Sequence, residues 1–253
     1  MTSNLKFEIL LFYYDRPKMV SNFALPSVFG STYENWELTI IDDSCAQDAE
    51  QVVNEFTEKY KHDKSKIKIL PTKDSMQEKE KRGGSTFGAF ANEALETLSK
   101  ADICLMLCDD DAIHEKYLQH LNEYYCKNPE VIYSYCKVSI YDPLCHKDFF
   151  EIQKIPSLKE PSQHPLNHSG VLKTVSCQVD ASQVSWRRSK FLEDEVRFAS
   201  PLTLNVDAAL YGQMADKWGG CEGNEILGQY KAVFSDQLGA REKIYNTLET
   251  END

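Results

Sequence analysis

Three consecutive aspartates, Asp109, Asp110 and Asp111, are the residues of this sequence best suited to chemistry. They follow the apolar run 103–108, which has the composition of a buried strand. Adjacent carboxylates repel one another, so such a cluster costs stability unless a cation or hydrogen bonds compensate. Mg²⁺ or Mn²⁺ would compensate, using one or two carboxylates and the phosphates of a substrate. The alternative is a solvated acidic turn, or a cap for a helix that starts near Glu115.

The elements that must position this cluster alternate between strand and helix. Ligands of open parallel sheets bind at the carboxyl ends of the strands, which is where the aspartates fall. The pattern therefore predicts an α/β fold with a mostly parallel central sheet covered by helices on both faces. The predicted strands are 7–13, 36–41, 65–70, 103–108, 131–140 and 171–184, and the predicted helices are a stretch after Pro17, 46–60, 84–98, 115–125, 186–198 and 206–218. Residues 71–84 and 141–170 are predicted to be irregular.

Composition and charge exclude several classes of protein. The 253 residues carry a net charge of -12, which argues against a nucleic-acid backbone or an anionic membrane surface as the partner. No apolar run approaches the roughly 20 residues that span a bilayer, and the first residues lack the pattern of a signal peptide. The eight cysteines contain no CxxC pair, which favours reduced thiols over disulfides or a zinc site. We therefore expect a soluble, cytoplasmic protein with no transmembrane segment.

Two segments of the first half carry a resemblance to a known family. Residues 13–17 read YYDRP, and residues 27–44 read SVFGSTYENWELTIIDDS. They resemble the opening of family-two glycosyltransferases of the GT-A fold, and the similarity continues through 84–98, which contains Asn92, into an Asp-x-Asp-like cluster. The resemblance implies a single GT-A domain over 1–253. Its nucleotide-sugar-binding half would be 1–125 and its acceptor-binding half 126–248, with a tail at 249–253.

The resemblance also implies which residues meet the nucleoside. Asp43, alone or together with Asp42, would accept a hydrogen bond from the base. Tyr13 or Tyr14 would line the base pocket. Asp15 stands where the family usually has an asparagine, and we count it among the cofactor-binding residues.

The aspartate cluster aligns with the family in two possible registers. The first places Cys108 where many members have their first aspartate, so that Asp109 contacts the ribose, Asp110 the metal, and Asp111 assists. The second makes Asp109 and Asp111 the metal-binding pair. We favour the first register, and Mn²⁺ or Mg²⁺ is the expected cofactor in either.

Cations near the site would meet the diphosphate. Arg16 and Arg82 are the candidates, although both also fit ordinary surface arginines. Some family members add a late histidine as a metal ligand, but no histidine follows His168 in this chain. His164 and His168 are left out of the metal site, because a loop histidine is more often solvated.

The second half resembles the family in outline. Residues 179–188 are similar to the strand that enters a helix with an arginine and shapes the acceptor floor. Residues 205–207, before a predicted helix, resemble the acidic motif that supplies the general base, which makes Asp207 the candidate catalytic base. A carboxylate in a first helical turn also fits a simple capping role.

Together these features predict a metal-dependent inverting hexosyl- or pentosyltransferase. The expected donor is a nucleoside-diphosphate sugar, with UDP-sugars favoured, and the expected acceptor is a hydroxyl of a glycan or another molecule. Two alternatives stay open. One is an inactive GT-A-like protein that binds glycans or nucleotides, and the other is a nucleotidyltransferase, which would usually need a Gly-rich phosphate loop after the first strand.

Overall fold

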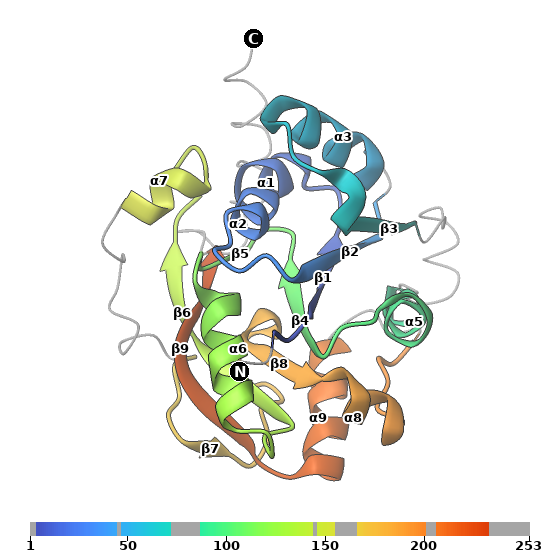
Figure 1. Ribbon diagram of the computed structural model, residues 1–253, viewed down its shortest axis with the longest axis vertical. Helices are drawn as coiled ribbons and strands as arrows, with labels where there is room; N and C mark the ends of the chain where they lie inside the picture. Colours follow the sequence, from blue (N-terminus) through green and yellow to red (C-terminus); the bar gives the residue numbers. More distant parts are fainter. Residues whose placement is uncertain are drawn as a thin grey trace.

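A computed structural model describes residues 4–44, 47–71, 87–143, 146–154, 166–200 and 206–232. Within these ranges nine strands form one curled sheet in the order β3-β2-β1-β4-β8-β6-β9-β5, with β7 paired to β9 (Figure 1). The strands are β1 (Phe7–Tyr13), β2 (Trp36–Asp42), β3 (Ile67–Pro71), β4 (Ile103–Cys108), β5 (Ala112–Ile113), β6 (Tyr133–Tyr141), β7 (Val171–Leu172), β8 (Val184–Arg187) and β9 (Cys221–Ala232).

Helices cover both faces of this sheet. The α-helices are α1 (Pro17–Met19), α2 (Leu25–Phe29), α3 (Ala49–Tyr60), α5 (Phe87–Glu93), α6 (Tyr117–Lys127), α7 (Phe149–Lys154), α8 (Arg188–Glu193) and α9 (Val206–Trp218). Short π-helices at Val20–Ala24 and Ala94–Leu98, and 3₁₀ turns at Lys64–Lys66 and Ala181–Gln183, complete them.

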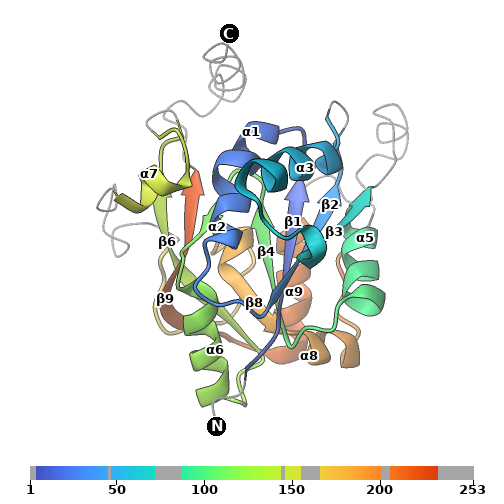
Figure 2. The ribbon, with the colours of Figure 1, turned by 45° about the horizontal axis from the view of Figure 1, so that its top comes forward.

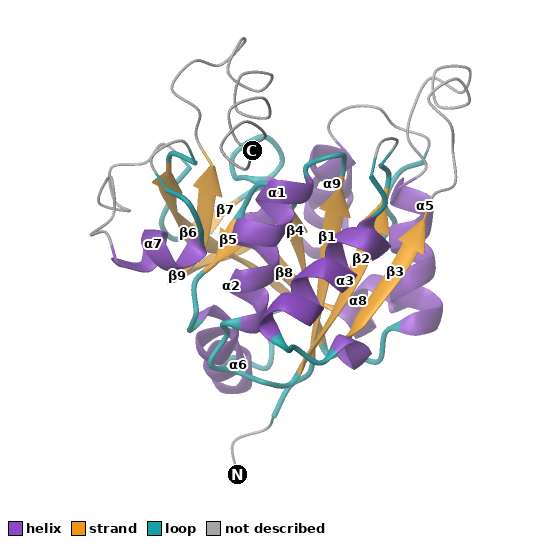
Figure 3. Cartoon of the chain, turned by 90° about the horizontal axis from the view of Figure 1, so that it is seen from above, coloured by secondary structure: helices purple, strands orange, loops and turns teal. Residues whose placement is uncertain are grey.

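Two apolar clusters fill the space between the layers. Alternate residues of β1, β2 and β4 point to opposite faces, as the period of a strand requires. One set packs against α2, α3 and α6, and the other packs against α5, α8 and α9. Figure 3 shows these helix layers on either side of the strands. The predicted α/β class, with a mostly parallel sheet of the GT-A type flanked by helices, is confirmed.

The parallel strands β1, β2 and β4 end at one edge of the sheet. Tyr13 at the end of β1 is level with Asp42 at the end of β2, and Phe12 is level with Cys108 at the end of β4 (Figure 2). These apolar runs were predictable because strands buried on both faces are almost continuously hydrophobic. Their shared edge carries the aspartate cluster.

Several predicted elements of the second half are wrong. The strand predicted over 171–184 is only two residues long, and the helix predicted from residue 186 begins at Arg188, because 184–187 pairs with β4 and β6 as β8. The stretch predicted to be irregular contains α7, and the long strand β9 was not predicted. Each error depends on pairing or packing between distant segments, which local periodicity does not record.

The described part of the chain contains no helix that is long and apolar enough to cross a membrane. The six cysteines of the described residues are reduced thiols, as predicted, and Cys45 and Cys145 lie outside the described residues.

Candidate active site at the carboxyl edge of the sheet

The loop after β4 directs the three aspartates into different surroundings. Asp109 is 3% exposed, and Asp111 is 1% exposed. The side chain of Asp110 retains 14% of its exposure, which makes it the most accessible of the three. Of the three carboxylates, that of Asp110 is therefore the one that a ligand from solvent can reach with least rearrangement.

Asp109 is tied to the segment that follows β1. Its carboxylate accepts the backbone N–H of Tyr14 at 2.8 Å and the guanidinium of Arg16 at 2.7 Å. The same guanidinium nitrogen lies 2.7 Å from Asp110, so Arg16 bridges both carboxylates. Burial raises the pKa of Asp109 to about 7, although Arg16 opposes the shift.

Asp111 is held by residues of β9 and of the turn before β8. Its carboxylate accepts the side-chain amide of Gln229 at 2.7 Å, the backbone N–H of Ala232 at 3.1 Å and the hydroxyl of Ser182 at 3.4 Å. Burial raises its pKa to about 8, and the charge of nearby Lys231 opposes this shift. The end of β9 thus orients an aspartate that lies more than a hundred residues earlier in the chain.

A further acid, the half-buried Asp180, extends this network. It pairs with Lys231 and accepts hydrogen bonds from Gln229 at 3.1 Å and from the backbone of Ser182 at 3.2 Å. Burial alone would raise the pKa of Asp180, but Lys231 and these hydrogen bonds hold it below its usual value. Sequence reasoning missed Lys231 and Gln229, because the strand that carries them was not predicted.

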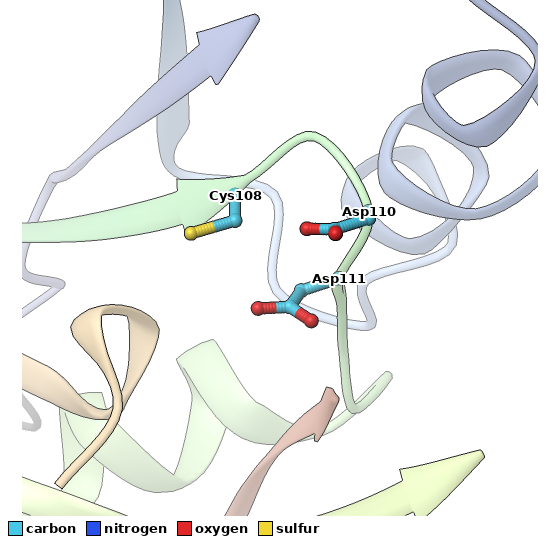
Figure 4. A group of neighbouring side chains, drawn as sticks. All are labelled: Cys108, Asp110 and Asp111. Atoms are coloured by element: carbon cyan, nitrogen blue, oxygen red, sulfur yellow. The ribbon is translucent and has the colours of Figure 1, made fainter. Parts of the chain in front are cut away.

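Cys108, Asp110 and Asp111 surround a common space. Figure 4 shows their side chains beside one another at the end of β4 and in the loop after it. One potential ligand atom from each lies within 4.8 Å of the other two. Carboxylate oxygens suit Mg²⁺ and Mn²⁺, and a thiolate suits softer ions. The donor set therefore fits a divalent cation, with Cys108 as the unusual member.

The residues predicted to meet the nucleoside lie at the ends of β1 and β2. Asp43 is 8% exposed, and its backbone N–H donates to the carbonyl of Tyr13. The carboxylate of Asp42 accepts the N–H of Ser44 at 3.0 Å and that of Ala49 at 2.8 Å. Asp42 therefore shapes the loop before α3.

The two tyrosines of this segment differ in exposure. Tyr13 is 1% exposed, packs in the core and donates its hydroxyl hydrogen bond to the carbonyl of Gln47 at 2.8 Å, whereas Tyr14 is 47% exposed. The geometry favours Tyr14 as the ring that lines a base pocket. Asp15 has a positive φ of 49°, a conformation that asparagine and aspartate adopt more readily than most residues. Its replacement of the family's asparagine is compatible with this turn.

The candidate base Asp207 lies in the first turn of α9 and is half-buried. Tyr211, one turn later, donates a hydrogen bond to the carbonyl of Ala181. Ala181 is adjacent to Ser182, whose hydroxyl contacts Asp111 and the backbone N–H of Cys108. The start of α9 is therefore anchored to the loop that borders the aspartate cluster.

Of the two histidines that the sequence analysis leaves out of the metal site, His168 lies within the described residues. The ring of His168 contacts the carbonyl of Gln178 at 2.9 Å, and its backbone carbonyl accepts the ammonium of Lys137. Arg82 and His164 lie outside the described residues.

Comparisons with known proteins show the fold. No protein-family model and no curated protein sequence matches the chain. Among solved structures, it is similar to S. aureus TarS 1-349, with a TM-score of 0.63 and 14% identity over 90% of this chain and 60% of that one. TarS 1-349 in complex with UDP gives a TM-score of 0.64 at 14% identity over 90% of this chain and 61% of that one.

A mannosyltransferase from Pyrobaculum calidifontis, in complex with GDP-Man and Mn²⁺, is also similar. Its TM-score is 0.59 at 12% identity, covering 95% of this chain and 60% of that one. The chain therefore has a GT-A-like fold. It spans about three fifths of the length of the TarS 1-349 and mannosyltransferase chains and 39% of the TarS chain, so its activity must be argued from its own site.

Proposed function

We propose that this chain is a metal-dependent inverting glycosyltransferase of glycan biosynthesis. It would transfer a hexosyl or pentosyl group from a nucleoside-diphosphate sugar, with UDP-sugars favoured, to an acceptor hydroxyl. The observation that carries the proposal is the position of Asp109, Asp110 and Asp111 at the carboxyl edge of a GT-A-like sheet. The proposal includes the cytoplasmic location expected from the sequence.

The donor would lie across the ends of β1, β2 and β4. In this role Asp43 accepts a hydrogen bond from the base, Tyr14 packs on the base, and Asp109 meets the ribose. Arg16 and Arg82 would face the diphosphate. The residues that contact the donor would be supported by Tyr13, Asp15 and Asp42. The burial of Tyr13 and the backbone contacts of Asp42 agree with this role.

A divalent cation, Mn²⁺ or Mg²⁺, would be held by Asp110 and Asp111 and would neutralise charge on the diphosphate. The fit rests on charge as well as on geometry. Among the described residues, the four carboxylates of Asp109, Asp110, Asp111 and Asp180 interact with two cations, Arg16 and Lys231. A divalent ion supplies the missing positive charge.

Asp207 would act as general base. It takes the proton from the acceptor hydroxyl while the oxygen attacks the anomeric carbon, and the bond from that carbon to the diphosphate oxygen breaks. The nucleoside diphosphate leaves from the opposite face of the sugar, so the anomeric configuration inverts. The anchoring of α9 through Tyr211 and Ala181 supports this placement of Asp207.

Calorimetric titration of the full chain tests the donor site. UDP, GDP and dTDP are titrated with and without Mn²⁺, using wild type, Asp110→Ala and a control, Asp216→Ala, at an exposed position on α9. We expect one nucleotide to bind only with Mn²⁺, and this binding to be lost in Asp110→Ala alone. Binding of no nucleotide under either condition would overturn the proposal.

Turnover tests the base. Once the donor nucleotide is known, release of nucleoside diphosphate is measured with candidate acceptors. Asp207→Asn is expected to lower turnover by about 10²- to 10⁴-fold, the usual contribution of a general base, with unchanged donor binding. Asp216→Asn is the matched control. Normal turnover in Asp207→Asn would reject this residue as the base.

One observation favours a second candidate, a GT-A-like binding protein without activity. Arg16 bridges Asp109 and Asp110 and already supplies part of the counter-charge that a metal would provide. This candidate predicts that a nucleotide or glycan binds without any metal and that no turnover occurs. The titrations above separate it from the transferase.

A further inference from the structure

Cys108 occupies a position where the resemblance would place an aspartate. Three other cysteines of the described chain, Cys104, Cys136 and Cys221, belong to the apolar clusters of the core. Cys108 belongs to neither of those two clusters and is half-buried at the end of β4. Its sulfur is thus in a different environment from the thiols that only fill the core.

The sulfur faces two carboxylates whose positions are set by other elements. Arg16 holds Asp110, while Gln229 and the backbone of Ala232 hold Asp111. The three potential ligand atoms lie within 4.8 Å of one another (Figure 4). A metal–sulfur bond of about 2.3 Å and a metal–oxygen bond of about 2.1 Å together span up to about 4.4 Å. One ion therefore fits between the three side chains with small adjustments.

We propose that Cys108 is a ligand of the cation at this site and that its sulfur makes the site prefer Zn²⁺, Co²⁺ and Cd²⁺ over Mg²⁺. The inference rests on the proposed function in taking this cluster as a metal site. Sulfur is a soft donor, and thiolates select ions of this kind, whereas Mg²⁺ prefers a shell of oxygen atoms. On binding, the thiol forms a sulfur–metal bond and releases its proton to solvent.

The same ligand set also predicts an order among the ions that the site accepts. Affinities for divalent ions generally rise from Mn²⁺ to Co²⁺, and a sulfur ligand increases that difference. We expect Mn²⁺ to bind more weakly than Co²⁺ and more strongly than Mg²⁺. Replacing the sulfur by a carboxylate should reduce the difference between the affinities for Co²⁺ and Mg²⁺.

Spectroscopic titration of the full chain with Co²⁺ tests the ligand directly. A cobalt–thiolate bond gives a charge-transfer band that carboxylate ligands do not give. We expect this band in wild type and in the control Cys177→Ser, which changes an exposed cysteine, and its loss in Cys108→Ser. A band of equal intensity in Cys108→Ser would overturn the proposal. Thermal unfolding of each variant establishes that it is folded.

Cys108→Asp provides a second measurement that does not depend on the serine variant. It keeps three ligands and replaces sulfur by oxygen. We expect its affinity for Cd²⁺, measured by calorimetry, to fall by at least about tenfold relative to wild type, a loss of the size seen when metal sites are altered. Its affinity for Mg²⁺ should rise. Equal Cd²⁺ affinities in the two proteins would contradict the role of the sulfur.

The outcomes also separate this inference from the proposed function. Metal-dependent nucleotide binding without any Cys108-dependent band would retain the transferase and reject the sulfur ligand. A Cys108-dependent band without binding of any nucleotide would retain the metal site and reject the transferase.

Discussion

Replacement of Lys231 by methionine should destabilise the protein strongly, although Lys231 lies close to the end of strand β9. Lys231 pairs with Asp180, and its charge also acts on Asp111. Methionine keeps most of the apolar stem and removes only the charge. The variant therefore leaves the carboxylates of Asp111 and Asp180, which both accept hydrogen bonds from Gln229, without their shared cation.

The expected loss of stability follows from the partial burial of Lys231 and Asp180. Removing one partner of a buried ion pair typically costs about 3–5 kcal/mol, because the other charge stays buried and uncompensated. The side chains of Lys231 and Asp180 are 29% and 13% exposed, and Asp180 keeps hydrogen bonds from Gln229 and Ser182. These contacts place the expected loss near the lower end, at about 3 kcal/mol.

Urea unfolding at neutral pH without added metal measures this loss. Lys190→Met is the control, because Lys190 pairs with Glu193 on an exposed helix face and should leave the midpoint unchanged. Adding Asp180→Asn to Lys231→Met should recover part of the loss, since one uncompensated charge disappears. A loss below about 1 kcal/mol, the range of exposed pairs, would show that Lys231 does not compensate buried charge.

Further predictions concern a buried glutamate of β1 and two glycines, one in β9 and one in α9. Burial raises the pKa of Glu8 above 4.5, although Thr39 donates a hydrogen bond to it. The folded state therefore holds this proton more tightly than the unfolded state, and the wild type loses stability as the pH rises above 4.5. Glu8→Gln should be more stable than wild type at neutral pH. Urea titrations should show that the difference in unfolding free energy shrinks as the pH falls to 4.5. A difference that does not depend on pH would contradict the burial of the charge. Gly228→Ala should cost about 1–3 kcal/mol in thermal unfolding, because its new Cβ would lie 2.5 Å from the ring of Tyr117. In contrast, Gly212→Ala in α9 meets nothing within 4 Å and should stabilise the chain by about 0.5–1 kcal/mol, so equal effects of the two would reject the packing argument.

The first half of the fold was predictable because its elements are recorded locally. In that half, the strands Phe7–Tyr13 and Ile103–Cys108 have the predicted bounds. In the second half, the helix Val206–Trp218 also has the predicted bounds. Buried parallel strands are continuous apolar runs, and parallel strands bring their carboxyl ends to one edge. The location of the aspartate cluster at the carboxyl edge of the sheet therefore followed from the sequence alone.

Only the tertiary structure decided which groups surround that cluster. β9 mixes polar and apolar residues, so its period does not identify it as a strand, yet it brings Gln229, Lys231 and Ala232 to Asp111 and Asp180. Likewise, the sequence did not determine that Arg16 bridges two aspartates. Composition and spacing determine which residues end which strands, whereas the partner of each carboxylate depends on contacts between segments up to 121 residues apart.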